Sequence, residues 1–74
     1  MNKKKYTILK QIRLDNNISQ RYMAATTGIA VQTLRNWENR LCAPNLSNIV
    51  KIARFLEDNN IPMPWQAIIE DYVK

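Results

Sequence analysis

Polar side chains that can read the edges of base pairs are concentrated in one short stretch of this sequence. They are Gln32, Thr33, Arg35 and Asn36. A carboxamide can exchange two hydrogen bonds with adenine, a hydroxyl can bond a base or a phosphate, and a guanidinium can clamp a phosphate or fork onto guanine. Leu34 and Trp37 lie between them at helical spacing and would face the opposite side. The spacing indicates an amphipathic helix that presents polar groups to a partner.

A second helical pattern precedes this one, and the two meet at a glycine. Ser19 is a good N-cap for the earlier helix, Ala24 suits a close helix crossing, and Gly28 can end that helix in a left-handed conformation. The later helix should span about residues 31 to 39. Two short helices joined in this way predict a helix-turn-helix, whose second helix enters the major groove of double-stranded DNA.

Three further helical patterns surround this motif, and no strand pattern is convincing. They cover about residues 5 to 15, 46 to 56 and 65 to 72. Asn45 or Ser47 can cap the second of these, and Pro62 or Pro64 can open the last. We therefore predict an all-α fold, a compact five-helix domain over residues 1–74 in which the second and third helices form the helix-turn-helix.

Positive charge is concentrated in the part of the chain that holds the motif. Residues 1–51 carry nine basic and two acidic residues, a net charge of +7, whereas residues 52–74 carry two basic and four acidic ones, a net charge of −2. A polyanion would approach the positive part, although surface lysines also keep small domains soluble. Residues 1–4 are expected to form a flexible basic arm near phosphates.

Several other classes of protein are disfavoured by composition. The single Cys42 cannot form an intramolecular disulfide, and without histidine the chain lacks the usual zinc ligands. No nucleophile lies beside a plausible base, so we expect no enzymatic activity, no cofactor and no small-molecule ligand. Apolar residues make up 46% of the chain but form no long run, which argues against a membrane span or signal peptide and favours a cytoplasmic protein.

Taken in order, these positions resemble the Cro and phage-repressor type of helix-turn-helix transcriptional regulators, with a lambda-repressor-like DNA-binding domain. The resemblance covers about residues 6 to 56. The matching positions are Arg13, Ser19, Gln20, Ala24, Gly28, Leu34, Trp37, Glu38, Pro44, Leu46, Ile49, Ile52, Ala53 and Leu56. The resemblance implies a sequence-specific DNA-binding regulator that reads bases with the third helix.

The resemblance also implies roles for individual residues. The base contacts would come from Val31, Gln32, Thr33 and Asn36. The phosphate contacts would come from Gln20, Arg35, Asn39, Arg40 and Asn45. A plain helix-start residue remains the alternative for Gln20, and a solvated helix face remains the alternative for the base readers. Arg13 and Glu38 would form a structural ion pair between the first and third helices.

Three residues depart from the family pattern. Ala30 replaces the usual Ser or Thr cap of the third helix, which should cost about 1 kcal/mol. Arg40 replaces a glycine, so the chain there is either strained or turns differently. Thr27 takes a place that is usually apolar.

An apolar stripe in the last helix indicates a protein interface. It consists of Trp65, Ile68, Ile69 and Tyr72. Residues 61–74 would then form a dimer surface, and the homodimer would bind a pseudo-palindromic operator. The alternative is an antitoxin-like interaction module, in which this helix binds a different protein and DNA binding is secondary.

Overall fold

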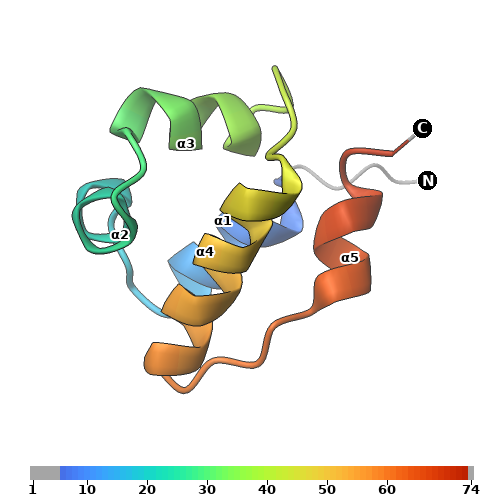
Figure 1. Cartoon of the computed structure of the whole chain (residues 1–74). Coiled ribbons are helices and arrows are strands. Elements are labelled where there is room, and N and C mark those ends of the chain that lie inside the picture. The colour runs from blue at the N-terminus through green and yellow to red at the C-terminus, as the bar shows by residue number, and fades with distance from the viewer. Residues whose placement is uncertain (1–5, 74) are drawn as a thin grey trace.

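The computed structural model describes residues 6–73, which fold into five helices and contain no strand (Figure 1). The helices are α1 (Ile8–Asp15), α2 (Gln20–Thr27), α3 (Val31–Glu38), α4 (Leu46–Asp58) and α5 (Trp65–Glu70). The predicted all-α fold is therefore confirmed, with α2 and α3 as the helix-turn-helix. The expected basic arm, residues 1–4, lies outside the described residues. None of the helices within residues 6–73 has the length and apolar character of a membrane span.

Local capping determines where three of the helices begin. The side chains of Thr7, Ser19 and Asn45 each accept a hydrogen bond from the backbone N–H three residues later, at 3.2, 2.9 and 2.9 Å. Each bond satisfies an amide that the helix itself leaves without a partner. Of the two caps considered for α4, the structure uses Asn45. Pro64 occupies the N-cap position of α5.

The predicted bounds of four helices need correction. The first helix begins at Ile8 rather than near residue 5, because the extended, fully buried Thr7 caps it. The third helix ends at Glu38, and Asn39 is its C-cap. Helix α4 continues to Asp58 rather than ending near residue 56, and α5 ends at Glu70 rather than near residue 72.

Left-handed residues end several helices and redirect the chain. Gly28 has φ +80°, and its N–H donates to the carbonyl oxygen of Ala24 at 2.9 Å, which closes α2. Arg40 also adopts a left-handed conformation, with φ +59°. The strained alternative expected for Arg40 is thus the one observed, and it costs about 1 kcal/mol relative to glycine.

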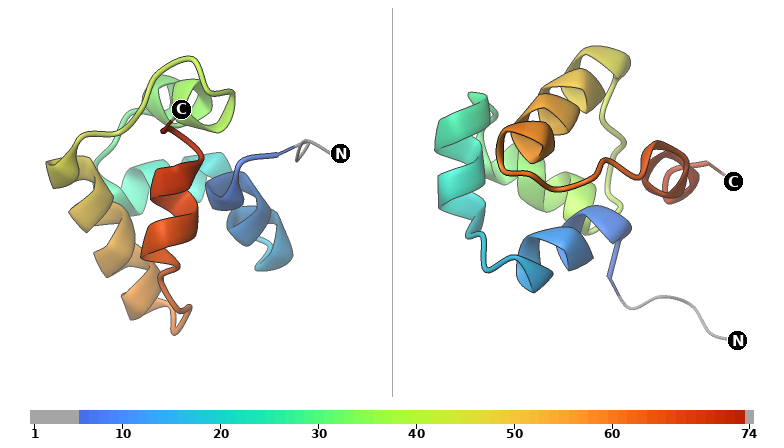
Figure 2. Two further views of the ribbon diagram at one scale, coloured as in Figure 1. Left: turned by 90° about the vertical axis from the view of Figure 1, so that its right-hand side faces the viewer. Right: turned by 90° about the horizontal axis from the view of Figure 1, so that it is seen from below.

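The hydrophobic core lies where α2, α3 and α4 meet and where α1 covers them. Its buried members are Leu9, Met23, Ala24, Ile29, Leu34, Trp37, Ile52, Phe55 and Leu56. Figure 2 shows α5 lying between α1 and α4, and α2 and α5 lie on opposite sides of the molecule in both Figure 1 and the second view of Figure 2. Helix α2 and the last helix are therefore separated in space, whereas Tyr72, just after α5, contacts the backbone of Trp37 on α3.

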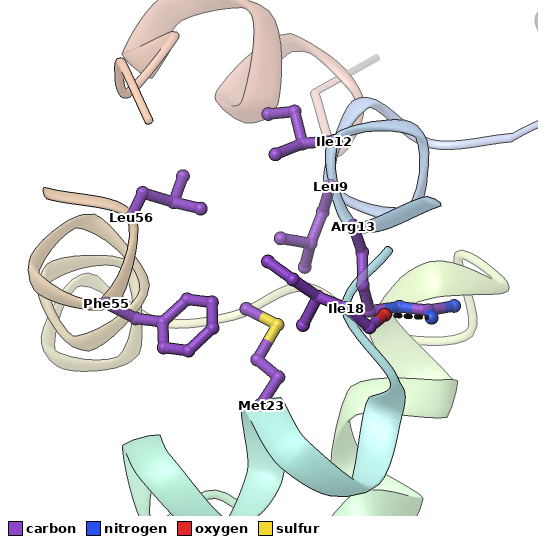
Figure 3. A pocket seen from close by; sticks show the side chains of 7 residues that line it. All are labelled: Leu9, Ile12, Arg13, Ile18, Met23, Phe55 and Leu56. Carbon is purple, nitrogen blue, oxygen red and sulfur yellow. Dashed lines mark hydrogen bonds between the residues drawn. The ribbon is translucent and has the colours of Figure 1, made fainter. Parts of the chain in front are cut away.

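The close-up in Figure 3 shows how a charged residue enters this core. The apolar side chains of Leu9, Met23 and Phe55 converge there, while the Arg13 guanidinium turns to the backbone of Ile18. Its Nη1 donates to the Ile18 carbonyl oxygen at 2.9 Å. The space between these side chains is too small for a water molecule, so it is a packing gap rather than a ligand site.

Candidate nucleic-acid interface

Helix α3 buries two apolar residues and Glu38, and its other polar side chains are exposed or half-buried. Leu34 and Trp37 are buried in the core. Gln32 and Arg35 are exposed, whereas Thr33 and Asn36 are half-buried, as is Val31. The structure thus leaves all four expected base-reading side chains at least partly accessible on α3, and it places Arg35 on the same helix.

The two carboxamides expected to read bases are bonded to each other. Nε2 of Gln32 donates to Oδ1 of Asn36 at 3.1 Å, as the spacing of one helical turn allows. One Nε2 hydrogen and the Oε1 atom of Gln32 remain available, and these are the groups that pair with adenine. The bond limits the rotation of both amides.

A buried ion pair joins α1 to α3. Arg13 donates from Nε to Oε2 of Glu38 at 2.8 Å and from Nη2 to Oε1 of Glu38 at 2.9 Å. The side chains are only 9% and 1% exposed, respectively. The structural pair expected between these residues is present, and it is bidentate. With the bond to Ile18, it places the end of α3 firmly against α1.

The ion pair continues outward through Gln20 to Arg35. Nε2 of Gln20 donates to Oε1 of Glu38 at 2.9 Å, and Oε1 of Gln20 accepts from Nε of Arg35 at 3.3 Å. Gln20 was expected to bind phosphate from the start of α2, yet its carboxamide is already bonded on both sides within the protein. We call these bonds between Glu38, Gln20 and Arg35 the α2–α3 relay.

The turn between α2 and α3 is held by a residue that departs from the family pattern. The hydroxyl of Thr27 donates to the carbonyl oxygen of Met23 at 2.7 Å and accepts from the N–H of Ile29 at 3.2 Å. A polar residue is tolerated there because both of these bonds are local. Ala30 is the N-cap of α3 and provides no side-chain hydrogen bond, as expected from its methyl group.

The remaining expected phosphate contacts border the loop between α3 and α4. Asn39, Arg40 and Asn45 are all exposed. Arg40 lies near a carboxylate, because its Nη2 is 3.4 Å from Oδ1 of Asp71. At that distance and exposure the pair is weak, so the guanidinium remains available to another anion.

The dimer surface expected on the last helix is only partly accessible. Trp65 and Ile69 are 45% and 44% exposed, but Ile68 is completely buried. Tyr72 lies beyond the end of α5, is half-buried, and donates from its hydroxyl to the carbonyl oxygen of Trp37 at 2.8 Å. Ile68 is therefore enclosed within its own chain, whereas Trp65, Ile69 and part of Tyr72 remain accessible.

Sequence reasoning missed Asp71, which joins the end of α5 to the start of α1. Its Oδ2 accepts from the N–H of Ile8 at the start of α1, and its Oδ1 faces Arg40. No local signal identifies this role, because the partners are far apart in the sequence. Burial, followed by the charges of Asp71 and Glu38, raises the pKa of the neighbouring Tyr72 to about 12.

Comparison with known proteins agrees with this arrangement of helices. The sequence matches the helix-turn-helix family over residues 9–57, which is more than half of the chain. No curated protein and no solved structure gives a significant match. The matched range contains α2, α3 and most of α1 and α4. The chain therefore belongs to the helix-turn-helix family of DNA-binding transcription regulators, in its Cro and phage-repressor type.

Proposed function

We propose that this protein is a sequence-specific regulator of the Cro or small-repressor kind, which inserts α3 into the major groove of double-stranded DNA. The observation that carries the proposal is the construction of α3, whose Leu34 and Trp37 are buried while Gln32 and Arg35 face solvent. A helix fixed on one side and polar on another can approach base edges without disturbing the core. The protein would regulate transcription by excluding or recruiting polymerase at the bound site.

Base readout in this proposal comes from the N-terminal half of α3 and from Asn36. Gln32 would pair with adenine through its free Nε2 hydrogen and Oε1, while Val31 would pack on a thymine methyl group. Thr33 would bond a base or a phosphate. The exposed residues around the loop between α3 and α4, Asn39, Arg40 and Asn45, would contact the backbone.

We propose a homodimer that binds a pseudo-palindromic operator. The exposed Trp65 and Ile69 on α5 offer apolar area, and α5 lies across the molecule from α2 (Figures 1 and 2). A two-fold axis at this surface would bring two copies of α3 to half-sites about 34 Å apart. Sedimentation should show a dimer on operator DNA, and Trp65→Ala should weaken its assembly.

Selection of bound sites from a random pool of DNA duplexes tests the proposed readout. Gln32→Ala should cost about 1 to 3 kcal/mol at one base position and leave the preferences unchanged at positions that neither Gln32 nor Asn36 reads. Gln11→Ala is the matched control, since Gln11 is an exposed glutamine on α1. An equal loss on selected and scrambled duplexes for Gln32→Ala would refute base reading by this residue.

A second candidate is an interaction module of the antitoxin kind. The same exposed pair, Trp65 and Ile69, favours it, because an apolar surface on α5 can equally bind a different protein. A purified protein that stays monomeric on its selected operator, together with a hetero-complex lost on Trp65→Ala, would support this candidate over the homodimer.

A further inference from the structure

The orientation of the Gln20 carboxamide is dictated by its buried neighbour. The side chain of Glu38 is only 1% exposed, and its two oxygens are already positioned by the Arg13 guanidinium. A carboxylate only accepts hydrogen bonds, so Gln20 must turn its NH₂ group toward Oε1 of Glu38, where the distance is 2.9 Å. The amide oxygen of Gln20 consequently points away from Glu38.

The amide oxygen of Gln20 that points away from Glu38 can accept a hydrogen bond from an N–H group, but it repels an anion. It accepts from Nε of Arg35 at 3.3 Å, an exposed bond that favours one orientation of the guanidinium. Within residues 6–73 the Nη1 and Nη2 donors of Arg35 have no hydrogen-bond partner, and together they match the oxygens of a phosphate. Without this bond, the exposed arginine would sample many rotamers and lose that freedom on binding DNA.

We propose that Gln20 acts on DNA through Arg35, as a positioning residue for the guanidinium that holds a phosphate. This inference rests on the proposed function and assigns a mechanism to the phosphate contacts that the family resemblance implies for Gln20 and Arg35. In the simpler alternative, Gln20 donates its second Nε2 hydrogen to a phosphate, independently of Arg35. The two mechanisms differ in how binding depends on salt.

The decisive measurement is the salt dependence of binding to one duplex of random sequence. Phosphate contacts do not depend on base sequence, so the operator need not be known. Each phosphate neutralised by a cationic side chain contributes about −0.9 to the slope of log K against log salt concentration. Arg35→Ala should therefore reduce the magnitude of the slope by about 0.9 for each bound protomer.

The proposal makes a distinctive prediction for Gln20→Ala, which removes no charge. If Gln20 orients Arg35, this neutral substitution should also reduce the magnitude of the salt slope, by up to about 0.9 per protomer. A direct amide contact would instead weaken binding at every salt concentration and leave the slope unchanged. Gln20→Met, which keeps the length of the side chain but cannot bond Arg35, should behave like Gln20→Ala.

A double-mutant cycle provides the second readout. Arg35→Ala should weaken binding about tenfold per protomer, and Gln20→Ala should then add less than about twofold to that loss. Arg21→Ala is the matched control, because Arg21 is an exposed arginine beside Gln20 on α2. The losses for Gln20→Ala and Arg21→Ala should multiply. Thermal unfolding of each variant verifies that it is folded at the temperature of measurement.

The outcomes separate this inference from the proposed function. Wild-type protein that shows no salt-dependent binding to duplex DNA would overturn both. Normal wild-type binding, combined with an unchanged slope for Gln20→Ala and independent losses for Gln20→Ala and Arg35→Ala, would overturn the positioning role alone. A reduced slope together with a non-additive cycle supports it.

Discussion

Removal of Glu38 should destabilise the protein more than removal of any exposed carboxylate. In Glu38→Ala the Arg13 guanidinium loses both bonds to the carboxylate and keeps the one to the Ile18 carbonyl oxygen. Arg13 is 8% exposed, so water cannot readily replace the lost acceptor. Breaking a buried pair by removing one member typically costs about 3 to 5 kcal/mol, because an uncompensated charge stays in the core.

This loss is large for a chain of 74 residues. Domains of this size have a free energy of unfolding of roughly 4 to 11 kcal/mol, and each kcal/mol shifts the midpoint of thermal unfolding by about 4 to 8 °C. Glu38→Ala should therefore lower the midpoint by at least about 12 °C. Replacement of both partners, Arg13→Met with Glu38→Leu, should recover most of the loss, since apolar residues of similar volume need no partner.

Urea unfolding followed by circular dichroism measures these changes. Glu57→Ala is the control, because Glu57 is exposed on α4, and its unfolding free energy should change by less than about 0.5 kcal/mol. A loss below about 1 kcal/mol for Glu38→Ala would contradict the argument, because it would mean that solvent screens the pair.

Three other predictions concern the caps and the end of the chain. Ala30→Ser should stabilise the protein by about 1 kcal/mol by capping α3, and a thermal midpoint that does not rise would show that the serine hydroxyl fails to reach the helix. Gly28→Ala should cost about 1 to 2 kcal/mol in urea unfolding, through strain at φ +80° rather than a clash, since nothing lies within 4 Å of the added Cβ. A pH titration followed by ultraviolet absorbance should show one of the three tyrosines ionising near pH 12, and Tyr72→Phe should lack that step. The pKa of Tyr72 in the folded protein lies above its ordinary value of 10. Between about pH 10 and 12 the folded protein therefore keeps a proton that the unfolded chain releases, and the free energy of unfolding should fall as the pH rises. This fall should be steeper than in Tyr72→Phe.

Features that depend on a few neighbouring residues were predictable from the sequence. Ser19 caps α2 and Gly28 ends it, because a cap and its amide lie within one helical turn. The same holds for the missing cap at Ala30. The start of α1 was misplaced because residues 5 to 7 continue the helical pattern, whereas Thr7 is extended and buried in the fold.

The last helix shows what periodicity cannot supply. Trp65, Ile68 and Ile69 fit one helical stripe, yet only Ile68 is buried. Which residue faces inward depends on how α5 packs on α1, and that packing involves a bond between Ile8 and Asp71. Spacing along the chain identifies an apolar face, but distant contacts decide whether it is used for folding or left for a partner.

The α2–α3 relay likewise depends on contacts between residues that are distant in the sequence. The sequence favoured Gln20 as a phosphate contact and Glu38 as half of a structural pair, and each inference treated its residue alone. The 2.9 Å bond between Gln20 and Glu38 connects the two roles, because the Glu38 carboxylate determines which end of the Gln20 amide faces Arg35. A buried substitution at Glu38 would then alter a phosphate contact without touching DNA, even in protein that remains folded. On this proposal, the core and the proposed DNA-binding surface are coupled through the hydrogen-bonded side chain of Gln20.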